Sequence, residues 1–336
     1  MTVKICLIGA GRAGMVDAKN FEFNVEYSSV TTVVDVSEQN AKEAAKKLRA
    51  EDYYTDLDKA LEEGDFDVVC IGAPTFAHSE AVIKAANAGK DIFCEKPLTI
   101  TVKEADEMKD AINKNNVKFQ IGFMRRFDKN FLRAQEIIKK GNIGEPLLIK
   151  SVGRGPGLPP EWYADLNKSN GLLAEVNSHD FDSMMWLAKS SIKEVYAKGD
   201  NFKTSQYEEK YPDFYDVATV NLEFDNGMLG LVDGACPATY GYDARMEILG
   251  SEGMLQIGTK ESHSVLTWNK DSKLVQDGNE SWRILFKDAY LKEAKHFIDC
   301  IINDKEPKVG IEAGKEAVKV VVAANESIKS GKPVNL

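Results

Sequence analysis

The chain has 336 residues, of which 43% are hydrophobic and 29% charged, with 25 glycines and 10 prolines. This composition is typical of a globular protein and excludes collagen-like, disordered and coiled-coil proteins. At about 150 residues per domain, the length predicts roughly two domains. Asp and Glu number 53 against 43 Lys and Arg, so the net charge is −10 and a general positive field for nucleic acid or an anionic membrane is lacking.

The N-terminal segment and the cysteines indicate a cellular compartment. The apolar run Ile5–Ile8 is far shorter than the apolar region of a signal peptide, and no apolar run approaches the roughly 18 residues of a membrane span. The five cysteines are an odd number and show neither a CxxC pair nor metal-ligand spacing. We therefore expect a soluble, cytoplasmic protein with reduced thiols and no metal site.

A glycine-rich loop directly follows the first predicted strand. The apolar run Val3–Ile8 is consistent with a buried strand, and it opens into Gly9-Ala10-Gly11-Arg12-Ala13-Gly14, which matches GxGxxG. A helical pattern follows, as a dinucleotide-binding motif requires. In such a motif Gly9 makes the tight turn, Gly11 lets a pyrophosphate approach the backbone, and Gly14 lets the helix pack on the strand. The N-terminus of the helix then binds the phosphates.

An acidic residue ends the second predicted strand, Tyr27–Val34. Asp35 lies 21 residues after Gly14, close to the spacing of about 20 at which such an acid binds the adenosine ribose. Its charge would repel a 2′-phosphate, so Asp35 favours NAD over NADP, although Arg12 has the length to reach a phosphate. The alternative is that Asp35 only caps a helix beginning near Ser37.

Strand and helix patterns continue to alternate up to residue 122, with strands at 67–71, 91–94 and 119–122 and helices at 79–88 and 102–115. This alternation predicts an α/β domain over residues 1–122, with a right-handed, doubly wound parallel sheet that binds NAD. Ligands of such sheets bind beyond the carboxyl ends of the strands. The residues that follow those ends are Ala73, Pro74, Thr75, Glu95, Lys96, Pro97 and the segment Phe123–Arg126.

The pattern changes over residues 123–336, which we expect to form a second, α+β domain. A helix is followed by alternating strands and then two closing helices; the candidate strands are 147–153, 194–200, 217–224, 228–236, 243–249 and 253–257. These predict one large, mainly antiparallel sheet with helices on one face. A second copy of the chain is the usual cover for the other face, so we expect a homo-oligomer.

Glu175 and His179 are the strongest candidate pair in this domain. Their i, i+4 spacing predicts a carboxylate and an imidazole within reach of each other on one helix face. Such a pair can orient a histidine and stabilise its protonated form, as a proton acceptor requires. A surface ion pair is the alternative that the pattern alone favours. The neighbouring Asp180 and Asp182 are expected on the helix surface.

Lys96 and His78 are further candidates. Lys96 follows a strand end, where it could donate a hydrogen bond to a reacting oxygen, or it is a solvated loop lysine. A cis bond to Pro97 would fix its direction. His78 lies at a helix start, where it contacts a nicotinamide or only packs against the helix.

These segments together resemble the glucose-fructose oxidoreductase, inositol dehydrogenase and MocA family. The resemblance covers nearly the whole chain and depends on four signatures: the Gly9–Gly14 loop, Ala73-Pro74 with His78, the triplet Glu95-Lys96-Pro97, and Gly171–Asp182 with His179. The helix Lys315–Gly331 and the residues after it are similar to the family's C-terminus.

The resemblance implies a Rossmann domain, a second domain whose open sheet forms dimers or tetramers, and NAD(P)-dependent oxidation of sugars or polyols. It implies that Lys96 orients the reacting hydroxyl and that His179 is the general acid/base, helped by Glu175, where the family more often has aspartate. The segment Ile121–Asp128 looks like that of inositol dehydrogenases, which implies that Arg126 approaches substrate hydroxyls. Trp162 and Tyr163 lie in a distinctive loop, where they either stack on a sugar ring or pack against the sheet.

The expected function is therefore NAD-dependent oxidation of a secondary alcohol of a cyclic polyol or sugar. Two alternatives stay open at this point. The first is an NAD-dependent glycosidase that oxidises its substrate transiently, and the second is a non-catalytic dinucleotide sensor on the same fold.

Overall fold

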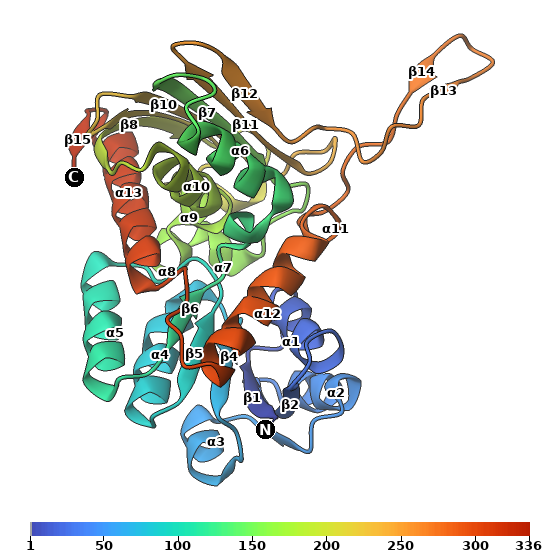
Figure 1. The fold of residues 1–336 in the computed structure, drawn as a ribbon, viewed down its shortest axis with the longest axis vertical. Coiled ribbons are helices and arrows are strands. Elements are labelled where there is room, and N and C mark those ends of the chain that lie inside the picture. Colours follow the sequence, from blue (N-terminus) through green and yellow to red (C-terminus); the bar gives the residue numbers. More distant parts are fainter. Residues whose placement is uncertain (1) are drawn as a thin grey trace. The chain divides into compact units, whose positions relative to one another are not determined.

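The computed structural model describes residues 2–336 and divides them into two compact units (Figure 1). The first comprises the chain up to Phe127 together with Asp288–Val318, and the second comprises Asp128–Lys287 with Lys319–Leu336. The domains expected from the sequence were contiguous, whereas these units are not. The difference arises because residues of the last two long helices, such as Phe297 and Val318, are buried in the cores of the first unit.

Within the described residues, the first unit contains a parallel sheet with the strand order β3-β2-β1-β4-β5-β6. The strands are β1 (Val3–Ile8), β2 (Ser28–Val34), β3 (Asp52–Tyr54), β4 (Val68–Ile71), β5 (Asp91–Cys94) and β6 (Phe119–Ile121). The predicted parallel α/β sheet is confirmed, and β3 was not foreseen. The strand order reverses between β1 and β4, so the crevice at their carboxyl ends is where such a sheet binds a ligand.

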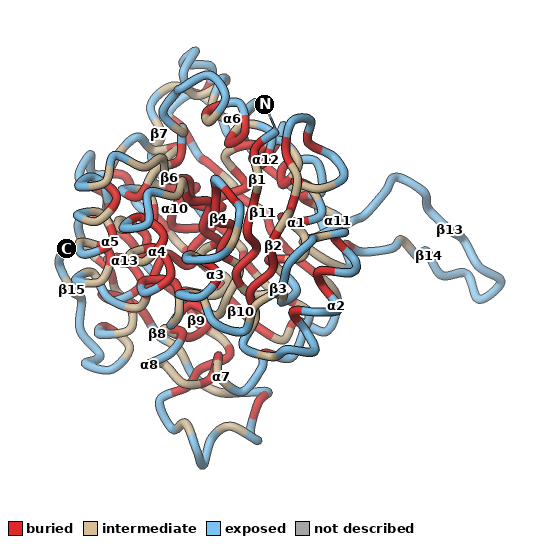
Figure 2. The backbone as a smooth tube through the Cα atoms, turned by 90° about the horizontal axis from the view of Figure 1, so that it is seen from below, coloured by how far each residue is buried: buried red, intermediate tan, exposed pale blue. Residues whose placement is uncertain are grey.

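Helices cover both faces of this sheet, as a doubly wound fold requires. They are α1 (Gly14–Phe23), α2 (Glu38–Leu48), α3 (Leu57–Glu63), α4 (His78–Asn87), α5 (Val102–Asn115), α12 (Lys287–Ile302) and the start of α13 (Ile311–Ser330). One core contains residues of α1, α2 and α12, and the other contains residues of α4 and α5. Strand β4, in the middle of the sheet, is entirely buried between them (Figure 2), whereas β3 at the edge is mostly exposed. A complete capping box at Thr101 and Glu104 starts α5.

The second unit contains a mixed sheet with the order β12-β11-β7-β10-β9-β8-β15. Its strands are β7 (Pro146–Arg154), β8 (Ile192–Asp200), β9 (Val217–Phe224), β10 (Leu229–Ala235), β11 (Asp243–Gly250), β12 (Met254–Ile257) and β15 (Val334–Asn335). The expected antiparallel arrangement is confirmed for most neighbours, but β7 and β10 are parallel. Gly153 and Gly234 have no side chains, which leaves space on the helix-covered side of this pair.

The helices of this unit are α6 (Lys129–Lys139), α7 (Glu161–Ala164), α8 (Leu166–Ser169), α9 (Gly171–Glu175), α10 (Ser178–Ala188), α11 (Trp282–Leu285) and the end of α13. Helix α10 packs on β7 and β10, and α9 packs on β9 and β10. The seven-stranded sheet is thus covered on the side to which Ile149, Ser151 and Val232 point.

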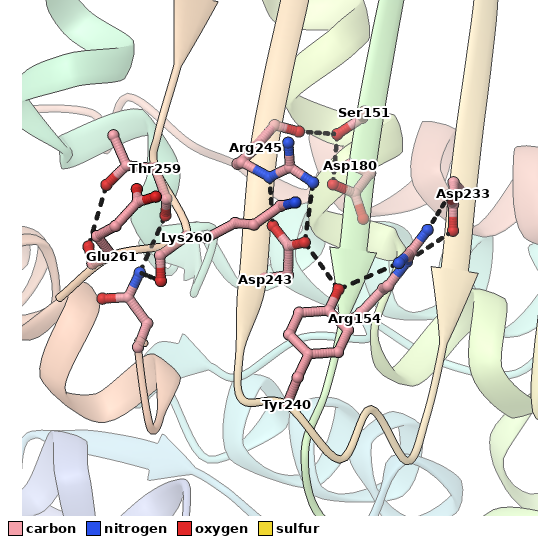
Figure 3. Close-up of polar contacts among 11 residues, drawn as sticks. Ser151, Arg154, Asp180, Asp233, Tyr240, Asp243, Arg245, Thr259, Lys260 and Glu261 are labelled. Atoms are coloured by element: carbon pink, nitrogen blue, oxygen red, sulfur yellow. Dashed lines mark hydrogen bonds and ion pairs between the residues drawn. The ribbon is translucent and has the colours of Figure 1, made fainter. Parts of the chain in front are cut away.

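The other side of this sheet, the open face, carries paired charges and a row of apolar side chains. Cross-strand neighbours form the row, which consists of Met254, Leu249, Leu148 and Leu229. Beside it, Lys150 pairs with Glu247 at 3.1 Å, and Arg154 and Arg245 bind Asp233 and Asp243 around the Tyr240 hydroxyl (Figure 3). The open face is therefore close to electrically neutral, although the chain carries a charge of −10.

A hairpin arm extends from the second unit between β12 and α11. It contains the short strands β13 (Thr267–Trp268) and β14 (Leu274–Val275), which pair only with each other. Its apolar side chains are exposed, Trp268 by 70% and Val265 by 62%, and the arm stands clear of the seven-stranded sheet (Figures 1 and 2). Over residues 2–336, no helix has both the length and the apolar character needed to cross a membrane.

Candidate functional site

The glycine loop of the first unit is packed so closely that side chains are excluded. A Cβ atom at Gly9, where φ is +87°, would lie 2.5 Å from the backbone nitrogen of Ala73. At Gly14 it would lie 2.3 Å from the Gly9 carbonyl oxygen, and at Gly72 it would lie 2.4 Å from Cα of Gly14. The turn between β1 and α1 therefore rests directly on the turn after β4.

Gly11 differs from these glycines because its Cβ position is open, with the nearest atom, the Gly72 carbonyl oxygen, 3.9 Å away. Helix α1 begins three residues later, and Ala13 provides no side-chain cap for its first N–H groups. A tight turn and an open glycine at the N-terminus of a helix are what a pyrophosphate requires. The loop therefore fits a dinucleotide. Arg12 is exposed on the same loop.

Asp35 is bound to this loop. Its Oδ2 accepts the N–H of Ala10 at 2.9 Å, and its Oδ1 accepts the N–H of Ser37 at 2.9 Å. The alternative role as a helix cap belongs instead to Ser37, whose hydroxyl accepts the N–H of Asn40 at the start of α2. The half-buried Asp35 carboxylate is thus held beside the glycine loop, in the position where an acid binds a ribose.

Ala73, Pro74 and Thr75 follow β4 and lead into α4. His78, at the start of that helix, is 1% exposed. Its Nδ1 lies 2.8 Å from the Pro97 carbonyl oxygen and its Nε2 lies 2.8 Å from the Ala73 carbonyl oxygen. Burial lowers the pKa of His78. Both nitrogens face backbone carbonyl oxygens, and the neutral ring donates its single N–H to one of them, so the ring packs between the Ala73 and Pro97 turns, which favours the packing role over a direct cofactor contact.

Lys96 and Arg126 follow the carboxyl ends of β5 and β6, which are neighbours in the sheet. The backbone N–H of Lys96 donates to Oε2 of Glu95 at 3.0 Å, and the Lys96–Pro97 bond is cis. Glu95 is 3% exposed, and Gly122 lets it pack closely, since a Cβ there would lie 3.3 Å from its Cδ. Lys96 and Arg126 themselves are half-buried.

Glu175 and His179 lie in the second unit, but not on one helix as their spacing predicted. Helix α9 ends at Glu175, and α10 begins at Ser178 after a break at Val176 and Asn177. The expectation of one shared helix face is therefore wrong. His179 is 5% exposed in the first turn of α10.

A hydrogen-bonded clasp, formed by Ser151, Asn177 and Asp180, anchors the first turn of α10 to the sheet. Asp180 Oδ1 accepts the Ser151 hydroxyl at 2.6 Å (Figure 3), and its Oδ2 accepts the Asn177 amide at 2.8 Å. The same amide group donates to the Gly153 carbonyl oxygen at 3.2 Å. All three clasp side chains are buried.

The clasp was not predicted from the sequence, and it corrects the position expected for Asp180. Asp180 and Asp182 were expected on the helix surface, but they are 0% and 1% exposed. The signal that was available is the pair of strand glycines: a Cβ at Gly153 would lie 2.1 Å from Asp180, and one at Gly234 would lie 2.2 Å from Asn177. A glycine inside a strand often marks a close approach of this kind.

Trp162 and Tyr163 lie in an aromatic cluster with Phe214. Tyr163 is 6% exposed and meets the Phe214 ring edge-on, with centroids 6.0 Å apart. Burial, and then the proximity of Cys236 and Glu175, raise the pKa of Tyr163 well above its usual value. Tyr163 therefore packs inside the second unit, while Trp162 is half-buried at the edge of the cluster.

Both halves of the chain are similar to known proteins. Residues 3–123 match the model of an oxidoreductase family with an NAD-binding Rossmann fold, and residues 135–336 match the C-terminal alpha/beta domain of the same family. A scyllo-inositol 2-dehydrogenase (NAD(+)) of Bacillus subtilis is 33% identical over 99% of this chain and 96% of its own length. A myo-inositol 2-dehydrogenase of Thermotoga maritima is also 33% identical, over 99% of this chain and 98% of its own length.

A solved structure of scyllo-inositol dehydrogenase from Lactobacillus casei, with bound NAD(H) and scyllo-inositol, has a TM-score of 0.91 and 27% identity. The similarity covers 100% of this chain and 99% of that one. Because both halves of the chain match its family models and the matched relatives share its full length, the chain belongs to the Gfo/Idh/MocA family of NAD-binding oxidoreductases.

Proposed function

We propose that the protein oxidises a secondary hydroxyl group of a cyclic polyol of the inositol type, with NAD as the oxidant. The observation that carries the proposal is the carboxyl end of the first sheet, where the glycine loop, Asp35 and Lys96 follow strands of one parallel sheet. The names of the relatives support an inositol as the substrate.

The first unit would hold the dinucleotide through Gly9, Gly11, Ala13 and Gly14, with the ribose at Asp35. NAD, when bound, supplies the acceptor for the hydrogen on the reacting carbon. The same edge of the sheet is formed by Ala73, Pro74, Thr75 and Glu95. Arg12 is exposed on the glycine loop, from which it can reach a phosphate of the dinucleotide. The negative charge of Asp35 supports NAD rather than NADP.

In this proposal Lys96 donates a hydrogen bond to the reacting hydroxyl oxygen, and His179 accepts its proton. Glu175 stabilises the imidazolium that forms. Arg126 and Trp162 bind the remaining hydroxyls and the ring of the substrate. Tyr163, which lies behind Trp162, supports that edge from the core.

The test is the absorbance of reduced nicotinamide during turnover of an inositol panel with NAD or NADP. Lys96→Met is expected to lower turnover at least 100-fold, since it removes a hydrogen bond made to the reacting oxygen, while the affinity for NAD changes little. Lys103→Met is the matched control, because that lysine is 85% exposed at the start of α5. Near-normal turnover of Lys96→Met would contradict the assigned role.

The two alternative functions receive less support. An NAD-dependent glycosidase would release sugar without net reduction of NAD, and a sensor would bind without turnover. The relatives named as dehydrogenases favour net oxidation over both.

We propose further that the protein is a cytoplasmic homo-oligomer, a dimer or a tetramer. Its five cysteines are buried and form no disulfide among the described residues, which suits a reducing compartment. The apolar row on the open face and the neutral pattern of paired charges beside it suit a second copy of the same surface, since a like surface with a net charge would repel itself.

A further inference from the structure

Three carboxyl groups are buried together in the first unit, and two of them, those of Asp17 and Glu293, have no role in the proposed reaction. Asp17 of α1 and Glu293 of α12 are fully buried, and Glu95 after β5 is 3% exposed. Isolated buried carboxylates are costly, so such groups either bind cations or stay protonated. Within residues 2–336 no group of His, Cys, Asp and Glu side chains is arranged to hold a metal ion, so the donors and charges around this cluster decide which of its carboxyl groups stay protonated.

Aromatic packing explains why the three acids meet. Phe93 of β5 contacts Phe21 of α1, with ring centroids 5.5 Å apart, and Phe297 of α12, with centroids 5.7 Å apart. Each acid lies one helical turn, or two strand residues, from one of these rings. Asp17 is four residues before Phe21, and Glu293 is four before Phe297. Glu95 is two residues after Phe93. Side chains at these spacings share a face of their element, so the acids form the layer next to the rings, at the carboxyl end of the sheet.

The surroundings of this layer offer few donors. Among the described residues, no N–H or O–H group lies within hydrogen-bonding distance of the carboxyl oxygens of Asp17 or Glu293 if both are ionised. Gln120 of β6 donates instead to the backbone oxygen of Glu293 at 3.1 Å. Only Glu95 has a donor, the Lys96 N–H.

The charged and titratable groups that face this layer are Lys96, Cys70 and Cys94. Burial raises the pKa of both thiols, which are therefore neutral. Lys96 is the cation that favours ionisation of Glu95. One ionised carboxylate therefore balances the positive charge of Lys96, and that carboxylate is Glu95.

The pKa values agree with this assignment. Burial, and then the charges of Glu95 and Glu293, raise the pKa of Asp17 well above its usual value, and burial does the same for Glu293. Burial also raises the pKa of Glu95, but Lys96 and a hydrogen bond from Asp17 oppose the shift. Asp17 is thus an acid that keeps its proton and has an O–H group with which to hydrogen-bond Glu95.

We propose that Asp17 is a positioning residue whose neutral carboxyl group donates a hydrogen bond to ionised Glu95, and that Glu95 in turn fixes the backbone of Lys96. Asp17 and Glu95 are both buried in this layer, and among the described residues Glu95 Oε1 has no other donor, while Glu95 Oε2 accepts the Lys96 N–H at 3.0 Å. The catalytic consequence of this proposal rests on the role of Lys96 in the proposed function. The protonation of Asp17 does not, and it is measured separately.

The first measurement is urea unfolding of the full chain between about pH 6 and pH 8. A carboxyl group that is protonated in the folded state and ionised in the unfolded state raises the unfolding constant tenfold per pH unit. Stability is therefore lost as the pH rises from the unfolded pKa, about 4, toward the raised folded one. Asp17→Asn should remove one such factor of ten per pH unit, and Asp17→Asn with Glu293→Gln should remove two.

Asp110→Asn is the matched control, because that carboxylate is exposed on α5 and its variant should follow the wild-type pH dependence. If Asp17→Asn also followed the wild-type dependence, Asp17 would be ionised in the folded protein, and the proposal would be overturned. Asn is close in shape to Asp, so this variant preserves the packing of the layer.

The second measurement is turnover. Asp17→Leu removes the donor to Glu95 and should lower kcat at least tenfold more than Asp17→Asn, which keeps an N–H donor, while KM for NAD stays within twofold. In a Lys96→Met background, the difference between the two Asp17 variants should disappear. If it persisted there, Asp17 would not act through Lys96.

The outcomes separate the two proposals. If Lys96→Met alone retained turnover, the proposed role of Lys96 would fail, but the pH dependence of unfolding would still report the proton on Asp17. If the pH dependence were unaltered in Asp17→Asn while Lys96→Met lost turnover, the proton assignment would fail and the proposed function would stand.

Discussion

Gly72 is the residue on which the geometry of the nucleotide loop depends most directly. A Cβ atom there would lie 2.4 Å from Cα and 2.7 Å from the nitrogen of Gly14, both of which are backbone atoms that cannot turn aside. Gly72→Ala should therefore separate β4 from α1 and lower the free energy of unfolding by about 3 kcal/mol. Urea unfolding measures the loss, and the KM for NAD should rise with it.

Gly310→Ala is the control for this change, because no atom lies within 4 Å of its Cβ position. It should alter the free energy of unfolding by less than about 1 kcal/mol. If Gly72→Ala and Gly310→Ala lowered the free energy of unfolding equally, the close contact between Gly72 and Gly14 would not be what makes Gly72→Ala destabilising.

The residues of the glycine loop could be predicted because each obeys a local rule. Gly9, Gly14 and Asp35 follow from spacing, and the structure places Asp35 on the loop as that spacing requires. His78 could not be settled, since its two partners are carbonyl oxygens of Ala73 and Pro97 on different turns. Backbone acceptors leave no trace in the sequence.

At the scale of elements, the position of His179 depends on how α10 is anchored to β7. Ser151→Ala removes the hydroxyl that donates to Asp180 at 2.6 Å and leaves a buried carboxylate oxygen without that partner. We expect a loss of about 2 kcal/mol in the free energy of unfolding. The midpoint temperature of thermal unfolding and the turnover rate should both fall, because His179 lies in the first turn of α10.

Ser191→Ala is the comparison, since Ser191 is exposed before β8. Its free energy of unfolding should stay within about 0.5 kcal/mol of the wild type. A Ser151→Ala variant as stable as Ser191→Ala would mean that the clasp does not anchor the helix.

The break between α9 and α10 shows where reasoning by periodicity stops. The i, i+4 spacing of Glu175 and His179 predicts one helix face, but the chain leaves the helix at Val176 and Asn177. Neither residue is a glycine or a proline, and the local signal, an asparagine at the N-cap position of α10, does not by itself specify a break. Asn177 is instead drawn to Gly153 and Asp180, contacts that depend on the tertiary structure. Helix α5, by contrast, has its own capping box and was predicted with its exact bounds.

At the scale of the whole molecule, the open face predicts the oligomeric state. Light scattering should give a mass of at least twice 37.2 kDa. Leu229→Glu combined with Leu249→Glu would bury two charges per copy in the apolar row and should shift the protein to monomers. Leu132→Glu, on α6 and 42% exposed, is the control and should leave the mass unchanged. A monomeric wild-type protein would contradict the proposed assembly.

The type of each sheet, parallel or mainly antiparallel, follows largely from the sequence pattern. Alternating strands and helices specify the parallel sheet of the first unit, and alternating strands alone specify most of the second. The parallel pair β7 and β10 could not be foreseen, because the residues that intervene give no preference for one neighbour. The hairpin arm was missed because its strands β13 and β14 have only two residues each.

The interrupted course of the chain through its two units has a consequence for biosynthesis. A ribosome releases residues up to Phe127 long before it translates Ala294, Phe297 and Val318, which fill the two cores of the first unit. During that interval the nascent first unit exposes apolar surface on both faces of its sheet. The nucleotide-binding half of the protein is thus synthesised first, yet it is completed only when almost the entire chain has left the ribosome.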